Sequence, residues 1–585
     1  MDYHYPYGDL AVDHIRVLTI VPMTDLATHV ECKLKTVSLN SDYNALSYTW
    51  GDPNLTRDIM IDGNRFSATV NMYKALMRLR ETLQACQPVQ IWIDAICINQ
   101  DNVTERNQQV GLMGDIYKGA KTVHIWLGEG TSRTPETFIL LEKLSKWQSI
   151  WDLVPSDRIA SAFEALTEVL SAAWWSRVWV VQEALLAFNP MLHCGDLSLR
   201  FNVVLDAGTR LRTDLVSDYA TLQTHMDDEH IVQMRTLVQE TTVVFTRLVI
   251  SIKMRLARHN GDNWKMFEKL GHTDAEAITD ALRLAQRANA SDARDKVYGI
   301  LGLLPRSFDL KPDYSRTLAE VHVDVALKLM EKTSSLVPLL DVGGDDTDNL
   351  PTWVPSWRME SPDIKLGSLN VTPEIDACGG LGCIYQYLGS GVLRVRGILA
   401  GCVTAISEPQ NIVCSAVGNE ALQKAIERWR STHLPDHHPN LWQDNLAESY
   451  DEQAFWHSIC QGICQEGRSH RRLCAADEPQ LRELARFIST QPPEAFTSMV
   501  GGWTEDESKG VTEAISACFD HQMMLRTTDG SLGCGPKQTV VGDGVYVLAG
   551  SVWPIVLRRC NDGRSERYKV IGPCYLHGKS DVPLS

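Results

Sequence analysis

The sequence predicts an α/β N-terminal domain with a parallel sheet, a mainly helical middle region, and a C-terminal α+β region that ends in β-strands. Apolar strands alternate with amphipathic helices in the first third, helical patterns follow to about residue 335, and extended segments dominate the C-terminal end. A chain of 585 residues is too long for one core and should form roughly two to four domains. The expected divisions are N-terminal β-strands at 1–40, the α/β domain at 41–195, the helical region at 196–340, and the mixed region at 341–585.

Three short apolar segments of the N-terminal third, 45–50, 89–94 and 122–127, have the composition of buried strands. A weaker alternating pattern over 15–40 predicts a leading hairpin or two strands. The Gly51-Asp52-Pro53 turn ends the first apolar strand. Because helical patterns separate the three strands, right-handed crossovers and a parallel sheet are expected.

The helices between these strands have their own local signals. Met72, Leu76, Leu79 and Leu83 recur on one helical face. The segment Asn102–Glu105 has the spacing of a capping box, with Asn in place of Ser or Thr. Further helical patterns occupy 135–150, 157–172, 275–290 and 318–331.

The C-terminal region is predicted from prolines and alternation. Two prolines exclude a helix over 350–357, and 391–400 alternates like a strand. Residues 410–500 have a helical and irregular texture. The β-meander that should end the chain comprises 544–550, 553–558 and 567–571.

Charge and composition exclude several classes of protein. The formal charge of −17 opposes binding to nucleic-acid phosphates or anionic lipid. The N-terminal segment lacks the pattern of a signal peptide, and the apolar run at 242–252 is too short to span a bilayer. With an odd count of 15 cysteines and no secretory signal, free thiols in a reducing compartment are expected. These features predict a soluble, intracellular, cytoplasmic protein without a nucleic-acid or membrane partner.

Polar residues at two strand ends indicate a binding site. In an open parallel sheet, ligands bind outside the carboxyl ends of the strands, which here are Trp50-Gly51-Asp52 and Asp94-Ala95. Glycine permits close backbone approach, and an indole offers a stacking face. The alternative is that Trp50 and Trp92 are core residues and that Asp94 caps a loop.

Residues 178–186 predict a largely buried helix with one carboxylate, Glu183, near its middle. A carboxylate in apolar surroundings is costly unless paired, and its pKa tends to rise. Glu183 is therefore a candidate catalytic residue, or one half of a structural ion pair with a partner from elsewhere such as Arg106. Arg177 lies six residues earlier and is not expected to share a helical face with Glu183.

Three blocks of the first third carry a family resemblance. They resemble the HET (heterokaryon incompatibility) domain of filamentous fungi over about residues 40–185, and three later segments are also similar to HET-containing proteins. The blocks are Tyr43–Asp52, Ile91–Asp101 and Trp174–Glu183, and the later segments are 293–302, 353–357 and 542–548. The resemblance implies a role in non-self recognition and in programmed cell death when incompatible hyphae fuse.

HET domains are in turn similar to TIR domains, which implies a flavodoxin-like sheet. The first block is similar to the opening strand and loop of plant TIR domains, and Ser176–Leu185 to the segment in which a tryptophan precedes a functional glutamate. By that match Glu183 would support cleavage of the nicotinamide–ribose bond of NAD, as a substrate and not a cofactor. The cysteine that often follows the tryptophan is Val180 here. The candidate substrate-binding residues are Tyr48, Trp50, Gly51, Asp94 and Trp179.

The alternative function is a non-catalytic module that signals by homotypic self-association, with an unknown incompatibility partner. Other candidate sites are weaker. A histidine and cysteine group has no tight zinc-knuckle spacing and is interpreted as ordinary helix residues, so no metal is expected; it comprises His457, Cys460, Cys464, His470 and Cys474. Arg294, Asp295 and Tyr298 are interpreted as packing and ion-pair residues.

Overall fold

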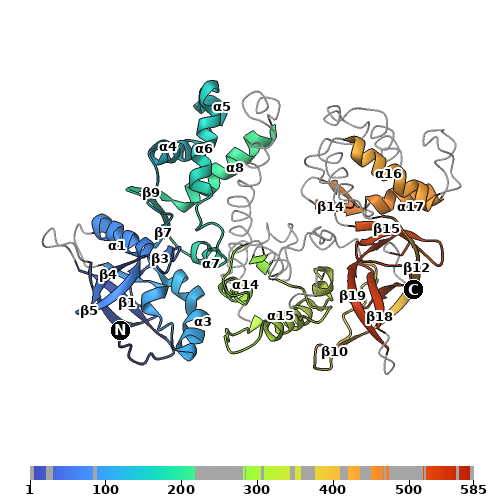
Figure 1. The fold of residues 1–585 in the computed structure, drawn as a ribbon, viewed down its shortest axis with the longest axis horizontal. Helices are drawn as coiled ribbons and strands as arrows, with labels where there is room; N and C mark the ends of the chain where they lie inside the picture. The colour runs from blue at the N-terminus through green and yellow to red at the C-terminus, as the bar shows by residue number, and fades with distance from the viewer. Residues whose placement is uncertain are drawn as a thin grey trace, which may run out of the picture. The chain divides into compact units, whose positions relative to one another are not determined.

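The computed structural model divides into two compact units, Met1–Arg316 and Thr317–Ser585, which are considered separately (Figure 1). The residues that the structure describes are 5–21, 30–83, 89–217, 278, 281–282, 285–286, 288–304, 308–342, 349–357, 376–408, 419–434, 450–460, 463–466, 469–472, 518, 522–560 and 566–579. Half of the predicted helix at 275–290 lies outside them.

The first unit is built on a nine-stranded mixed sheet of order β5-β4-β2-β1-β6-β3-β7-β8-β9. Its strands are β1 (His14–Ile20), β2 (Glu31–Ser38), β3 (Asn44–Tyr48), β4 (Thr56–Ile61), β5 (Asn64–Thr69), β6 (Val89–Trp92), β7 (Val123–Trp126), β8 (Pro190–Cys194) and β9 (Leu197–Arg200). The central strands β6, β3, β7 and β8 pair in parallel. The predicted α/β class with a parallel core is confirmed.

The order of the parallel strands reverses at one point of the sheet, and such a reversal is where open α/β sheets bind ligands. Along the chain, β3 is followed by β6 on one side, whereas β7 and β8 are added on the other side. The direction of winding therefore reverses between β3 and β7, as in flavodoxin-like sheets. Strands β1 and β2, from the segment expected as leading strands, belong to the same sheet, where β1 pairs antiparallel with both β2 and β6.

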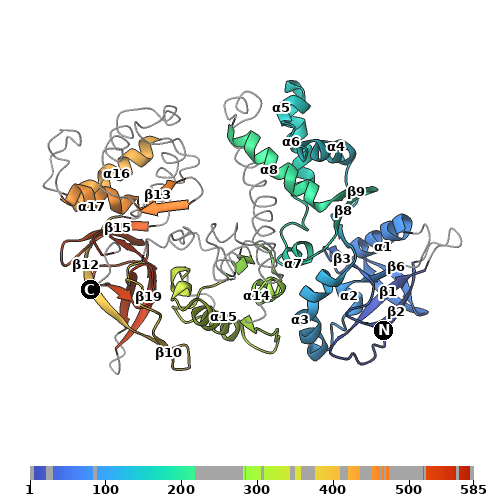
Figure 2. The same cartoon turned by 180° about the vertical axis from the view of Figure 1, so that it is seen from behind.

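Helices cover both faces of this sheet. Helix α1 (Val70–Leu83) lies on one face and α3 (Val103–Gly119) on the other, as both views show (Figures 1 and 2). The predicted cap of α3 is present, because the Asn102 side chain accepts a hydrogen bond from the Glu105 amide. The Glu105 carboxylate does not complete a capping box; it pairs with the buried Arg16 at 2.6 and 3.0 Å.

The remaining helices of the first unit are α2 (Asp94–Cys97), α4 (Thr134–Leu144), α5 (Ile150–Leu153), α6 (Ile159–Leu170), α7 (Val180–Leu185), α8 (Phe201–Ser217) and α14 (Asp295–Tyr298), with 3-10 turns η1 (Ser156–Arg158) and η3 (Leu301–Leu303). Helix α7 is shorter than the predicted helix over 178–186. It begins at Val180, so Arg177 lies in the turn before it.

The second unit contains a seven-stranded antiparallel sheet of order β19-β18-β17-β12-β15-β16-β20. Its strands are β12 (Gly397–Ile406), β15 (Gln522–Thr527), β16 (Leu532–Pro536), β17 (Gly544–Leu548), β18 (Ile555–Cys560), β19 (Arg567–Pro573) and β20 (Tyr575–Leu576). The predicted C-terminal meander is confirmed as β17-β18-β19.

Other elements of this unit are α15 (Leu318–Thr333), η5 (Val337–Leu340), the hairpin β10 (Tyr385–Tyr387) and β11 (Leu393–Val395), α16 (Asn419–His433), α17 (Tyr450–Ile459), and the hairpin β13 (Ile463–Glu466) and β14 (Ser469–Arg472). Cys464 and His470 lie in this last hairpin, so their interpretation as helix residues is wrong; Cys474 lies outside the described residues. Within the described residues no cluster of three potential ligands could hold a metal ion. No described helix is long and apolar enough to cross a bilayer.

Candidate functional site

The alternation of strand β3 separates two environments. Leu46 and Tyr48 pack into the apolar core that includes Met72 on α1, and the Tyr48 hydroxyl lies 3.4 Å from the Met72 sulfur. Because successive side chains of a strand point to opposite faces, Ser47 points away from this core. Its hydroxyl donates a hydrogen bond to the Glu183 carboxylate on α7.

A second hydrogen bond continues this buried network. The indole nitrogen of Trp174 donates to the Ser47 oxygen at 2.7 Å, so the serine is acceptor and donor at once. Trp174, Ser47 and Glu183 are all buried, with Glu183 2% exposed. A buried network of this kind fixes the position of α7 against β3, since each polar group would be costly without its partner.

Burial dominates the electrostatics of Glu183. Desolvation raises the pKa of this carboxyl from its ordinary value of 4.5 to about 7, against the lowering effects of the Arg177 charge and the Ser47 hydrogen bond. The nearby Asp94 charge raises it further, and the Tyr117 hydroxyl lowers it. Burial therefore favours the protonated form of Glu183 far more than in an ordinary carboxyl.

Arg177 is the opposite charge that acts most strongly on Glu183. Arg177 precedes α7, so it shares no helical face with Glu183, and it acts on the carboxylate as a nearby charge. The guanidinium also donates to the Tyr48 carbonyl oxygen at the end of β3. Arg106, the partner considered from the sequence, instead lies 4.5 Å from the centre of the Tyr314 ring.

Trp50 and Asp94 form the exposed edge of the site. The Trp50 indole nitrogen donates to the Asp94 carboxylate at 2.8 Å, and the indole is 44% exposed. Trp50 is thus no core residue, unlike Trp92, which is fully buried. Burial raises the pKa of Asp94, while the Arg177 charge and the Trp50 hydrogen bond lower it. Gly51 has φ +78°, a left-handed conformation that favours glycine at this turn.

Of the six candidate residues, the structure brings Trp50, Asp94 and Glu183 together, with Gly51 next to Trp50 in the chain. The Asp94 and Glu183 charges also act on the buried Tyr48 hydroxyl, whereas Trp179 is separate. Arg177 acts on both Asp94 and Glu183, and Trp50 is bonded to Asp94. The Tyr48 ring lies on the opposite face of β3 from Ser47. The Trp179 indole points elsewhere and lies 3.3 Å from the Asp295 carboxylate.

Asp295 belongs to the later segment 293–302, which contacts Trp179 and Gln182. Desolvation raises the pKa of Asp295 to about 6, and the Tyr314 hydroxyl donates to it at 2.7 Å. The backbone amide of Gly302 donates to the Gln182 side-chain oxygen at 3.1 Å, which ties this segment to α7. The interpretation of Asp295 as a packing residue fits these contacts.

Ser47 and Trp174 were not singled out from the sequence, and Arg177 was considered only as a residue that shares no helical face with Glu183. All three residues lie inside the tryptophan-containing blocks described above. No local spacing links Ser47 to the others, because it is 127 positions from Trp174 and 136 from Glu183. The available signal was a serine inside a buried strand, since a buried hydroxyl needs a partner.

The stretch of chain that builds this site matches a known family. Residues 43–183 match the family model described as Heterokaryon incompatibility protein (HET), and this stretch begins just before β3 and ends at Glu183. The chain therefore contains a HET domain, and the resemblance noted in the sequence is confirmed.

The similarity extends beyond this domain. The chain is 23% identical to Heterokaryon incompatibility protein 6, OR allele, of Neurospora crassa over 677 aligned positions, which cover 98% of this chain and 94% of the relative. No solved structure matches the chain, so the likeness to TIR domains stays a prediction from the sequence.

Proposed function

We propose that this protein acts in heterokaryon incompatibility and that its HET domain triggers programmed cell death when incompatible hyphae fuse. The observation that carries the proposal is the alignment with the Neurospora crassa incompatibility protein over 98% of this chain and 94% of that protein. Both the HET domain and the regions that follow it therefore have counterparts in a protein named for this process. The convergence of the first and third blocks on the Ser47–Glu183 bond supports the HET domain as the trigger.

The test is inducible expression of the full chain in a filamentous fungal host. Wild-type protein should arrest growth and make hyphae permeable to a vital dye. The matched variants are Glu183→Gln, which removes the buried charge, and Glu136→Gln, which removes an exposed charge on α4. Glu136→Gln should kill as wild type does, and normal growth with abundant wild-type protein would overturn the proposal.

A second candidate is hydrolysis of NAD by the same domain. It is supported by the placement of Trp50 and Asp94 at the carboxyl ends of the parallel strands β3 and β6, with Glu183 within electrostatic reach. Water would replace nicotinamide at the ribose carbon, releasing neutral nicotinamide, ADP-ribose and a proton. Because nicotinamide is a cationic leaving group in NAD, the protein needs only a carboxylate to stabilise the developing positive charge.

Hydrolysis of NAD requires that the Glu183 carboxylate be accessible and ionised. The carboxylate is 2% exposed, so NAD reaches it only after side chains at the Trp50 edge move, and concentrated, self-associated protein is the preparation to assay. Since the ionised form is the active one, nicotinamide release should rise as pH increases through about 7. Glu183→Gln should abolish it, and equal release by both proteins would refute the catalytic role.

The non-catalytic alternative is signalling by homotypic self-association. It is supported by the closed state of the network, in which Glu183 is buried and bonded to Ser47. It predicts self-association without loss of NAD, and toxicity that survives Glu183→Gln. Toxicity and NAD consumption measured in the same cultures separate the two mechanisms.

A further inference from the structure

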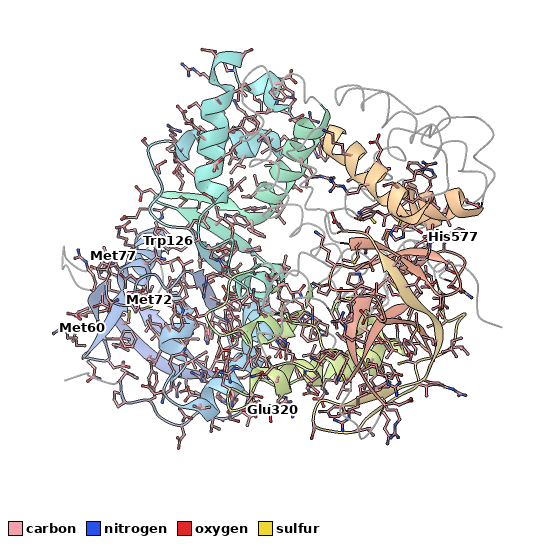
Figure 3. The ribbon with its side chains drawn as sticks, turned by 45° about the vertical axis from the view of Figure 1, so that its right-hand side comes forward. Met60, Met72, Met77, Trp126, Glu320 and His577 are labelled. Atoms are coloured by element: carbon pink, nitrogen blue, oxygen red, sulfur yellow. The ribbon has the colours of Figure 1, made fainter. Side chains whose placement is uncertain are left out.

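A cavity lies on the opposite face of the sheet from Ser47 and Glu183. Its volume is about 620 Å³, within the range of small-molecule sites, and Trp126, the last residue of β7, lines it together with α1 and the turn after β8. Figure 3 shows Trp126 and Met77, another lining residue, in the N-terminal unit. The cavity is thus at the carboxyl ends of parallel strands, beside the reversal between β3 and β7, where open α/β sheets bind ligands.

Aromatic and cationic side chains share this cavity. Tyr73 provides partly exposed ring surface, Trp126 lies behind it at 4% exposed, and the Arg57 guanidinium lies 5.8 Å from the centre of the Tyr73 ring. Lys74 and Arg78 come from the next turns of α1. The indole of Trp126 is held in place, because its nitrogen donates to the Asn71 side chain at 2.9 Å. Rings and cations together suit an anion that carries a planar group.

The carboxylates of the cavity are more exposed than the cations they pair with. Arg78 is 18% exposed and its partner Asp196 is 93% exposed, at 3.8 Å. Lys74 is 39% exposed and its partner Glu129 is 63% exposed. Exposed ion pairs contribute little to stability, so a phosphate can displace these carboxylates from the cations at small cost.

The same carboxylates argue against a simple anion. Three acidic side chains line the cavity beside three basic ones, so a bare phosphate meets repulsion as well as attraction. A ligand that also offers hydroxyl groups can donate hydrogen bonds to the carboxylates, as ribose does in nucleotide sites. We propose that this cavity binds a nucleoside monophosphate, with the phosphate on Lys74 and Arg78, the ribose on a carboxylate, and the base against Tyr73. The proposal does not depend on the function of Glu183.

Calorimetric titration of the full-length protein with AMP, GMP, CMP and UMP tests this site, with inorganic phosphate and adenosine as partial ligands. At least one nucleotide should bind more tightly than either partial ligand. Lys74→Gln should weaken that nucleotide about tenfold, the equivalent of one charge-assisted hydrogen bond. The matched control Lys118→Gln, an exposed lysine on α3, should leave affinity unchanged.

A second variant separates ring recognition from charge. Tyr73→Leu should weaken the nucleotide and leave phosphate binding unchanged, with unfolding curves recorded to confirm that each variant is folded. The proposal is overturned if none of the four nucleotides binds at millimolar concentration. It is also overturned if phosphate binds as tightly as the nucleotides, or if Lys74→Gln and Lys118→Gln have equal effects.

Discussion

Replacing Glu183 with glutamine should change how the stability of the protein depends on pH. Glutamine keeps an oxygen that can accept the Ser47 hydrogen bond, so the variant removes the ionisable group and little else. The folded-state pKa of Glu183 is raised by burial from 4.5 to about 7. Its stabilising contribution is therefore fully present below pH 4.5 and is lost as pH rises through 7.

The magnitude follows from the size of that change. A pKa raised from 4.5 to about 7 corresponds to about 3 kcal/mol in the free energy of unfolding. Between pH 4.5 and pH 8, titration of Glu183 should lower the free energy of unfolding of wild type by about 3 kcal/mol. Glu183→Gln should lack this loss. The stability of the variant relative to wild type should therefore increase over this pH range. At pH 8 the variant should need more urea to unfold than wild type.

Urea unfolding of both proteins at half-unit steps from pH 5 to 8 measures the effect, because the difference between them cancels the other titrating groups. Glu136→Gln is the matched control, since it removes a carboxylate from the exposed side of α4. If the curves of wild type and Glu183→Gln run parallel over the whole range, burial does not raise the pKa of Glu183.

Three further variants test the packing around this network. Ser47→Ala should cost about 1–3 kcal/mol in urea unfolding, because it removes the donor to Glu183 and an indole acceptor, and unchanged stability would show that the network is open in solution. Glu105→Leu should cost about 3–5 kcal/mol, since it leaves Arg16 buried without its carboxylate, and a neutral result would contradict the pairing. Gly302→Ala should lower the melting temperature at a cost of about 1–3 kcal/mol, because its Cβ would lie 2.7 Å from a neighbouring backbone Cα, and an unchanged melting temperature would exclude that close approach.

The strands of the first unit were predictable from local composition. The segments that became β3, β6 and β7 are short apolar runs separated by helical patterns, and such runs need burial on both faces. The position of β1 beside β6 was not predictable in the same way. Strand pairing depends on contacts between segments that are distant in the sequence. The weak alternation of apolar and polar residues in β1 is compatible both with a strand in the main sheet and with a separate hairpin.

The candidate site was also predictable only where local sequence marks it. Glu183 stands out as a lone carboxylate in an apolar run, and Trp50 and Asp94 stand out at strand ends. The role of Arg177 depended on where α7 begins, and helix ends are poorly marked when no capping side chain is present. Trp179 was placed with the substrate by resemblance, whereas the fold turns its indole toward Asp295, 116 positions later in the chain.

The central proposal is that the HET domain of this chain triggers cell death. The most direct measurement is the viability of hyphae after induced expression of the full-length protein, scored by dye uptake and colony growth. Induction of wild type should kill the hyphae, at an expression level where Glu136→Gln is equally lethal. Undiminished viability in hyphae that contain abundant, folded wild-type protein would contradict the proposal.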